Sequence, residues 1–120
     1  SEKYIDERRY ALFFAKDKHS LSHWGKLKIG NHLKLKKIPS EYIKEALESI
    51  SEEKYKDQLY ELLKNKLKSV KARNSYELKG KLFRFALGRG FESNKILQNI
   101  NQLFSENNIN SSDEYETFND

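Results

Sequence analysis

The chain has 120 residues and a net charge of +5, from 23 basic and 18 acidic side chains, and only 37% of its residues are hydrophobic. The absence of cysteine excludes disulfides and thiolate metal sites, and no apolar run approaches the roughly 18 residues of a membrane span. We therefore expect a soluble, cytoplasmic protein with a thin core, no membrane contact, no secretion signal and no large buried pocket.

The charge is divided unevenly along the chain. Residues 106–120 contain five acidic side chains and no Lys or Arg, so positions 1–105 hold 23 basic and 13 acidic side chains, a net charge of +10. An excess of this kind favours an anionic partner, with nucleic acid as the first candidate. Because Lys also solubilises helix faces that carry Glu, a simple solvated surface stays open as the alternative.

Residues typical of helix starts and helix ends divide most of the chain into six runs, each with apolar residues at helical spacing. Pro39 stands in the first turn of one run, where its missing N–H does no harm, and Ser75 and Ser93 are predicted N-caps of two others. Gly88 and Gly90 predict a helix stop. The predicted helices cover residues 5–17, 24–36, 39–50, 52–71, 76–88 and 94–105.

Aromatic side chains on these apolar stripes are assigned to the core. They are Tyr10, Phe13, Phe14, Trp24, Phe85 and Phe91. Tyr4, Tyr60 and Tyr76 are less determined, and they stay open because basic and stacking residues together can mark a single-strand binding surface.

One segment has two local interpretations. Residues 26–35 alternate polar and apolar side chains around Gly30-Asn31, which also fits a β-hairpin. An internal repeat decides for a helix, because a shift of about 53 positions superposes this segment on 78–87, which has helical spacing. The same shift places Leu47 on Ile100. Gly30 costs the predicted helix about 1 kcal/mol relative to Ala.

The repeat predicts the fold class. We expect an all-α protein of tandem three-helix repeats, with two copies and six helices, in residues 1–51 and 52–105. A disordered acidic tail, 106–120, should follow. A unit of about fifty residues buries little apolar surface alone, so the copies should pack end to end in an elongated array. We expect a monomer.

Several short segments carry a family resemblance. They are Tyr4-Ile5-Asp6-Glu7-Arg8-Arg9-Tyr10-Ala11, Trp24-Gly25, Lys28-Ile29, Leu33, Lys36-Lys37-Ile38-Pro39, Lys81-Leu82 and Gly88-Arg89-Gly90-Phe91. In order, spacing and duplication they resemble the RecX family of recombination regulators, over residues 4 to about 104. The family usually has three such repeats, so the resemblance implies the second and third, and the lack of any methionine leads us to expect a missing upstream repeat.

The resemblance implies a regulatory protein that binds the RecA nucleoprotein filament, and in addition single-stranded DNA, and inhibits recombinase activity in DNA repair, recombination and the SOS response. The alternative is a basic helical protein-interaction or DNA-binding module without RecA specificity. Lys37 departs from the family, which usually has Gly there. A left-handed Lys would cost roughly 1–2 kcal/mol, so we expect this helix to end differently.

Basic side chains are the candidate contacts with DNA or the filament. In the first copy they are Lys26, Lys28, Lys34, Lys36 and Lys37. In the second copy they are Lys64, Lys66, Lys68, Lys71, Arg73, Lys79, Lys81, Arg84 and Arg89. For any single member a solvated face is an equal alternative, so the prediction concerns the group.

Catalysis finds little support in the sequence. Asp17, His19 and His23 lie near one another but lack a fourth ligand at a suitable spacing, so we expect no metal, no cofactor and no enzyme. An enzyme whose catalytic part lies outside this chain, and an interaction scaffold without DNA affinity, remain as rivals. The acidic tail around Tyr115 and Phe118 could also fold back on the basic body and compete with a partner.

Overall fold

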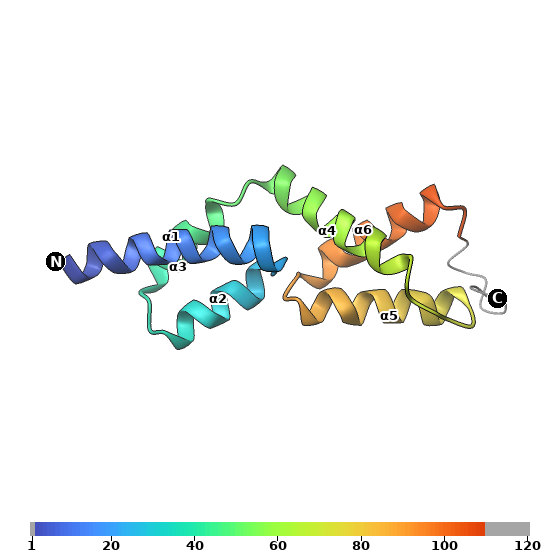
Figure 1. Cartoon of the computed structure of the whole chain (residues 1–120), viewed down its shortest axis with the longest axis horizontal. Helices are drawn as coiled ribbons and strands as arrows, with labels where there is room; N and C mark the ends of the chain where they lie inside the picture. Colours follow the sequence, from blue (N-terminus) through green and yellow to red (C-terminus); the bar gives the residue numbers. More distant parts are fainter. Residues whose placement is uncertain (1, 110–120) are drawn as a thin grey trace.

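A computed structural model describes residues 2–109, with side chains from residue 6 onward (Figure 1). Its helices are α1 (Glu2–Ser22), α2 (Lys26–Leu35), α3 (Ser40–Glu48), α4 (Glu52–Leu67), α5 (Ser75–Gly88) and α6 (Ser93–Glu106). No strand occurs in this part of the chain, so the helical interpretation of 26–35 is confirmed and the hairpin is excluded. Most of the predicted acidic tail, with Tyr115 and Phe118, lies outside the described residues.

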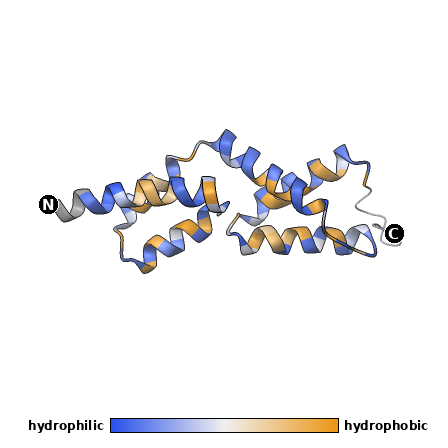
Figure 2. Cartoon of the chain, viewed as in Figure 1, coloured by the Kyte–Doolittle hydropathy of each residue, from blue (hydrophilic) through white to orange (hydrophobic). Residues whose placement is uncertain are grey.

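The helices form two three-helix units that lie end to end (Figure 1). Helices α1 to α3 pack on one another, as do α4 to α6, and within residues 2–109 no helix of one unit packs along a helix of the other. The longest dimension of the molecule is more than twice either of the others. Hydrophobic and hydrophilic residues are interspersed along the helices, as a thin core requires (Figure 2). The predicted elongated all-α repeat fold is confirmed.

The first helices of the two units use different side chains at matching positions. The buried residues of α1 are Ala11, Ala15 and His19, and those of α4 are Tyr55, Leu59 and Leu63. These two sets align with a shift of 44 positions, whereas the later helices align with a shift of 53. Two features cause the difference. The connection after α4 is longer than that after α1, and α5 begins one turn before the position that the 53-residue shift assigns to the start of α2.

Two aromatic predictions on α1 are wrong. Phe13 is 72% exposed and Tyr10 is 40% exposed, because the side chains that this helix buries fully are the small Ala11 and Ala15. Phe91 is fully buried, which confirms its assignment to the core. The other three aromatic residues assigned to the core, which are partly buried, are Phe14, Trp24 and Phe85.

Helix caps also differ from the predictions. Ser75 and Ser93 are the first residues of their helices rather than the caps. Asn74 caps α5, accepting a hydrogen bond from the Glu77 N–H at 2.8 Å, since its extended backbone and side-chain oxygen suit that role as well as serine does. Glu92 precedes α6 and makes no side-chain cap bond.

Two helices end several residues away from the predicted position. Helix α1 continues to Ser22 rather than 17, because His19 in its last turn is buried against the second unit. Helix α4 ends at Leu67 rather than 71, because the chain then turns and buries Val70 and Ala72.

Lys37 adopts the left-handed conformation that we expected it to avoid. Its φ is 62°, and the equivalent Gly90 has a φ of 93°, so the two units end their second helices alike. The same pair of backbone hydrogen bonds closes both turns: Lys37 to Lys34 and Ile38 to Leu33, Gly90 to Leu87 and Phe91 to Ala86. The expectation of a different helix end is wrong, because these bonds and the burial of Ile38 offset the strain of a left-handed Lys.

The units meet where the start of α2 reaches the turn between α5 and α6. The first N–H groups of a helix have no partner within it, and α2 has no side-chain cap. Acceptors of the second unit bind these N–H groups instead. The Gly25 N–H donates to the Arg89 carbonyl at 2.8 Å, that of Lys26 to the Tyr55 hydroxyl at 2.9 Å and that of Leu27 to the Gly90 carbonyl at 2.9 Å. The second unit therefore caps a helix of the first.

Two glycines make this approach possible. A Cβ on Gly25 would lie 2.4 Å from the carbonyl carbon and oxygen of Gly90, and a Cβ on Gly90 would lie 2.3 Å from the Lys28 Cβ. Backbone therefore touches backbone between the units, and neither position has room for a side chain.

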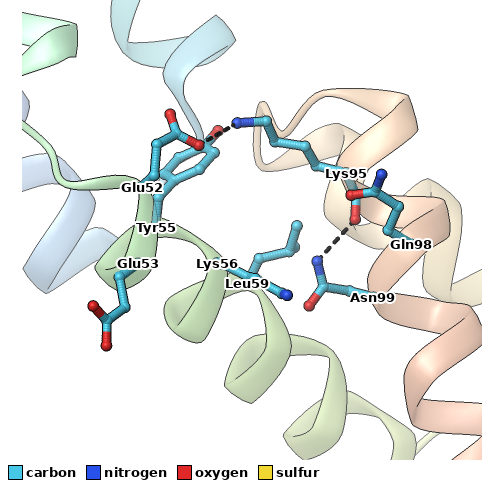
Figure 3. Close-up of a pocket in the computed structure, with 8 residues that line it drawn as sticks. All are labelled: Glu52, Glu53, Tyr55, Lys56, Leu59, Lys95, Gln98 and Asn99. Atoms are coloured by element: carbon cyan, nitrogen blue, oxygen red, sulfur yellow. Dashed lines mark hydrogen bonds and ion pairs between the residues drawn. The ribbon is translucent and has the colours of Figure 1, made fainter.

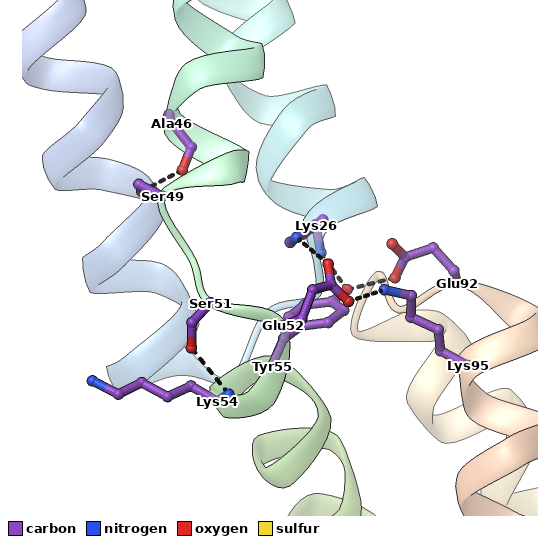
Figure 4. A network of polar contacts seen from close by, with 9 residues as sticks. All are labelled: Lys26, Ala46, Ser49, Ser51, Glu52, Lys54, Tyr55, Glu92 and Lys95. Carbon is purple, nitrogen blue, oxygen red and sulfur yellow. Dashed lines mark hydrogen bonds and ion pairs between the residues drawn. The ribbon is translucent and has the colours of Figure 1, made fainter.

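Tyr55 fills the centre of this junction (Figure 4). Its ring packs against His19 and Phe91, with centroid distances of 5.2 and 5.3 Å. Its hydroxyl donates to the Glu92 carboxylate at 2.5 Å while it accepts from the Lys26 N–H. Burial, together with the bond to Glu92, raises the pKa of Tyr55 well above its ordinary value, so the hydroxyl stays protonated and keeps both bonds.

The junction predicts an asymmetric response to two glycine substitutions. Gly90→Ala should lower the free energy of unfolding by about 2 kcal/mol or more, because it combines a left-handed alanine with a clash against Lys28. Gly88→Ala meets no atom within 4 Å and should leave stability unchanged or raise it by up to about 1 kcal/mol. Urea denaturation of both variants makes the comparison, and equal stabilities would contradict this view of the junction.

His19 makes the junction sensitive to acid. Its Nδ1 lies 3.0 Å from the Trp24 carbonyl, which can only accept, so Nδ1 carries the proton and the buried Nε2 has no partner among the described residues. Burial lowers the pKa of His19. The unfolded chain therefore takes up a proton first, and stability is lost as pH falls through about 6.5, the ordinary histidine value, towards the lowered folded value.

Denaturation midpoints at pH 7.5 and 5 test this acid sensitivity. His19→Asn keeps a donor nitrogen for the Trp24 carbonyl but cannot titrate, so its midpoint should fall less between the two pH values than that of the parent. A parent-like pH dependence in His19→Asn would rule out His19 as the source.

Candidate nucleic-acid interface

The predicted basic contacts divide into those engaged within the protein and those free to meet a partner. The engaged side chains are Lys26, Lys28, Lys66, Arg73, Lys81 and Arg89. The side chains that make no hydrogen bond, ion pair or ring contact with other described residues are Lys34, Lys36, Lys37, Lys64, Lys68, Lys71, Lys79 and Arg84.

Two engaged residues hold the junction together. Lys26 lies 3.4 Å from the Glu52 carboxylate, with its ammonium 4.9 Å from the centre of the Tyr55 ring (Figure 4). Glu52 also bonds Lys95 at 3.0 Å, and these two lysines, Lys95 foremost, lower the pKa of Glu52. Arg89 donates to the Ser22 carbonyl at 3.0 Å, across the two units. These cations stabilise the fold and are weak candidates for phosphate contacts.

Aromatic rings hold two more of the predicted cations. The Lys28 ammonium lies 4.7 Å from the Trp24 ring centre, and the Lys66 ammonium lies at the same distance from that of Phe85. The guanidinium of Arg89 covers Phe85 as well, at 5.4 Å. Such contacts reduce the freedom of the side chain without removing its charge.

Glu77 bonds two of the engaged cations, one on α5 and one in the loop before it. It bonds Arg73 at 2.9 Å and Lys81 at 3.3 Å, and chiefly the bond from Arg73 lowers the pKa of Glu77. Lys81 also donates to the Lys71 carbonyl at 2.5 Å, which ties the loop before α5 to the helix.

The free cations form two groups, one at the end of α2 and one on the second unit. Lys34, Lys36 and Lys37 follow one another at the end of α2 and are exposed, and we call them the α2 lysines. The second group, at the end of α4 and along α5, comprises Lys64, Lys68, Lys71, Lys79 and Arg84. Cations near a helix C-terminus are favourable without any partner, so their position alone does not prove binding.

Two hollows on the second unit contain residues that the sequence did not single out as a site. One, of about 260 Å³, lies between α4 and α6 (Figure 3). Charges of both signs line it, and the buried Asn99 Oδ1 there has no hydrogen-bond partner within the described part of the chain. The other, of about 590 Å³, lies between α5 and α6 and includes Tyr76, Gly80 and Phe83. Their spacing along one helix face is a signal that could have revealed it.

A broader hollow of about 820 Å³ lies beside the junction and includes His19 and His23. Gln58 fills the space between these histidines, since its Nε2 lies 2.7 Å from both the His19 carbonyl and the His23 Nδ1. Across residues 2–109 no three His, Cys, Asp or Glu side chains are placed to hold a metal, and none of the helices there is long and apolar enough to cross a membrane.

The division between engaged and free cations can be measured as stability. Arg89→Ala should lower the free energy of unfolding by about 1 kcal/mol, because it removes a charged hydrogen bond and a contact with Phe85. Lys34→Ala should change it by less than about 0.5 kcal/mol. Thermal or urea unfolding gives both values, and an Arg89→Ala variant as stable as Lys34→Ala would show that the bond contributes nothing.

Known proteins match both units in order. The second three-helix domain of RecX matches residues 6–47, and its third three-helix domain matches residues 52–98. The chain is 32% identical over 109 residues to the "Regulatory protein RecX" of Clostridium acetobutylicum, covering 88% of this chain and 50% of that protein. It is 29% identical over 104 residues to the protein of the same name from Clostridium beijerinckii, covering 85% of this chain and 48% of that protein.

The chain thus spans about half the length of the curated relatives it matches. No solved structure matches it. Because the two matched domains coincide with the two packed units, and follow each other in the same order, this chain belongs to the RecX family.

Proposed function

We propose that this chain is the filament-binding part of a cytoplasmic regulatory protein that binds the RecA nucleoprotein filament and inhibits recombinase activity. It acts in DNA repair, recombination and the SOS response, touches single-stranded DNA within the filament, and works as a monomer. The observation that carries the proposal is the match of both units to successive RecX domains, together with relatives named regulatory proteins.

The shape and charge of the chain support this role. An elongated body joined through backbone contacts can lie along a filament without bending at the junction. The exposed α2 lysines and the free cations of α4 and α5 present positive charge on both units, which suits a nucleoprotein partner. Regulation then proceeds by binding, and we propose no catalytic step and no cofactor.

A filament titration tests the proposal. RecA filaments are preformed on single-stranded DNA, the chain is added, and filament mass and ATP hydrolysis are followed, with RecA alone and DNA alone as controls. Loss of filament or of ATP hydrolysis near one chain per few RecA protomers is expected. Unchanged filaments at saturating chain, in a preparation shown to be folded, would contradict the proposal for this part of the protein.

Matched charge variants separate specific contact from net charge. Replacing the α2 lysines by Gln should weaken filament inhibition severalfold, because each removes a cation with no partner inside the protein. Replacing Lys44, Lys54 and Lys56 by Gln removes the same charge from other exposed positions and should have little effect. Equal weakening by both triple variants would mean that overall charge, rather than these contacts, drives binding.

A further inference from the structure

The hollow between α5 and α6 combines apolar and basic side chains in a way that the fold does not require. Phe83 and Leu97 line it together with Gly80. Arg84 folds back over that glycine, with its Nη1 3.2 Å from the place of an added Cβ. We call this hollow the α5 groove.

Tyr76 is the unusual member of the α5 groove. Its side chain is 72% exposed, and its ring makes no stacking contact and no hydrogen bond with other described residues. Phe83 lies two helical turns further along the same face and is partly buried against the core. An exposed aromatic ring, with a partly buried one two turns away on the same helix face, offers apolar surface on which a flat ligand can stack.

The charge of the α5 groove selects an anion. Arg73, Lys79 and Arg84 line it, and Glu77 is its one acidic lining residue. Bonds from Arg73 and Lys81 already neutralise Glu77. Lys79 and Arg84 have no partner within residues 2–109, so two positive charges of the groove can bind an anionic ligand.

We propose that the α5 groove binds single-stranded nucleic acid, with a base stacked on Tyr76 and phosphates bound by Lys79 and Arg84. An acidic peptide without apolar side chains would satisfy the cations but leave the exposed ring unused, whereas an unpaired strand satisfies both. Duplex DNA hides its base faces and fits less well. This proposal rests on the proposed function in one respect, because it locates the single-stranded DNA contact that the proposed function includes.

A pair of equally exposed aromatic residues provides the test. Tyr76→Ala should weaken binding of a fluorescent oligothymidylate by at least about fivefold in anisotropy titrations. Phe13→Ala, on α1 and also 72% exposed, should bind like the parent. Tyr76→Phe should restore affinity because it keeps the ring. Equal affinities of Tyr76→Ala and Phe13→Ala would overturn the proposal.

Salt dependence separates the roles of ring and cations. Replacing Lys79 and Arg84 by Gln should reduce the slope of log affinity against log salt by about 1.4, since each single-strand phosphate contact contributes about 0.7. Tyr76→Ala should leave that slope unchanged. An abasic strand of equal length should bind more weakly than oligothymidylate, and equal binding, or preference for polyglutamate, would overturn stacking.

The filament assay keeps this site distinct from the proposed function. Inhibition of RecA filaments with no measurable binding to oligothymidylate would overturn the α5 groove and leave the regulatory role standing. Tyr76-dependent binding of single strands without any effect on filaments would support the α5 groove and contradict the regulatory role.

Discussion

The start of α2 cannot satisfy its own backbone, and this constraint shapes the molecule. Its first N–H groups are bound by the Arg89 and Gly90 carbonyls and by the Tyr55 hydroxyl, all from the second unit. Hydrogen bonds of this kind are directional, so they fix the orientation of two units whose helices do not pack along one another. Gly25 and Gly90 are needed because any side chain would separate the groups that bond. The free lysines on both units are consequently held in one arrangement.

Much of the fold could be predicted from the sequence because it is local and repeated. Apolar spacing identified the helices, and the repeat distinguished α2 from a hairpin where local rules could not. The junction was not predictable, since Gly25 and Gly90 are 65 positions apart and each looks locally like an ordinary loop or helix stop. Lys37 shows the limit of propensity, because two backbone bonds and a buried neighbour hold it in a conformation that a lysine alone disfavours.

The candidate site was predictable only as a group of charges. Composition and clustering identified the basic residues, but sequence cannot reveal which of them the protein uses internally. Arg89 and Ser22, or Lys66 and Phe85, come together only through tertiary packing. Exposure is equally hidden, because the apolar spacing places Phe13 in the core and does not decide the position of Tyr76. The free cations and the α5 groove can therefore be identified only from the structure. They reduce the number of surfaces that are candidates for binding a nucleoprotein partner.

Amide hydrogen exchange at the start of α2 tests the junction most directly. If the second unit caps this helix, the Gly25, Lys26 and Leu27 amides should exchange about as slowly as amides in the cores of α2 and α5, because opening them requires the units to separate. The protection should disappear at these three amides in Gly90→Ala, while the core of α5 stays protected. Fast exchange at all three in the parent protein, with both cores protected, would show that the units move independently and would contradict the single rigid body on which the proposed filament contact depends.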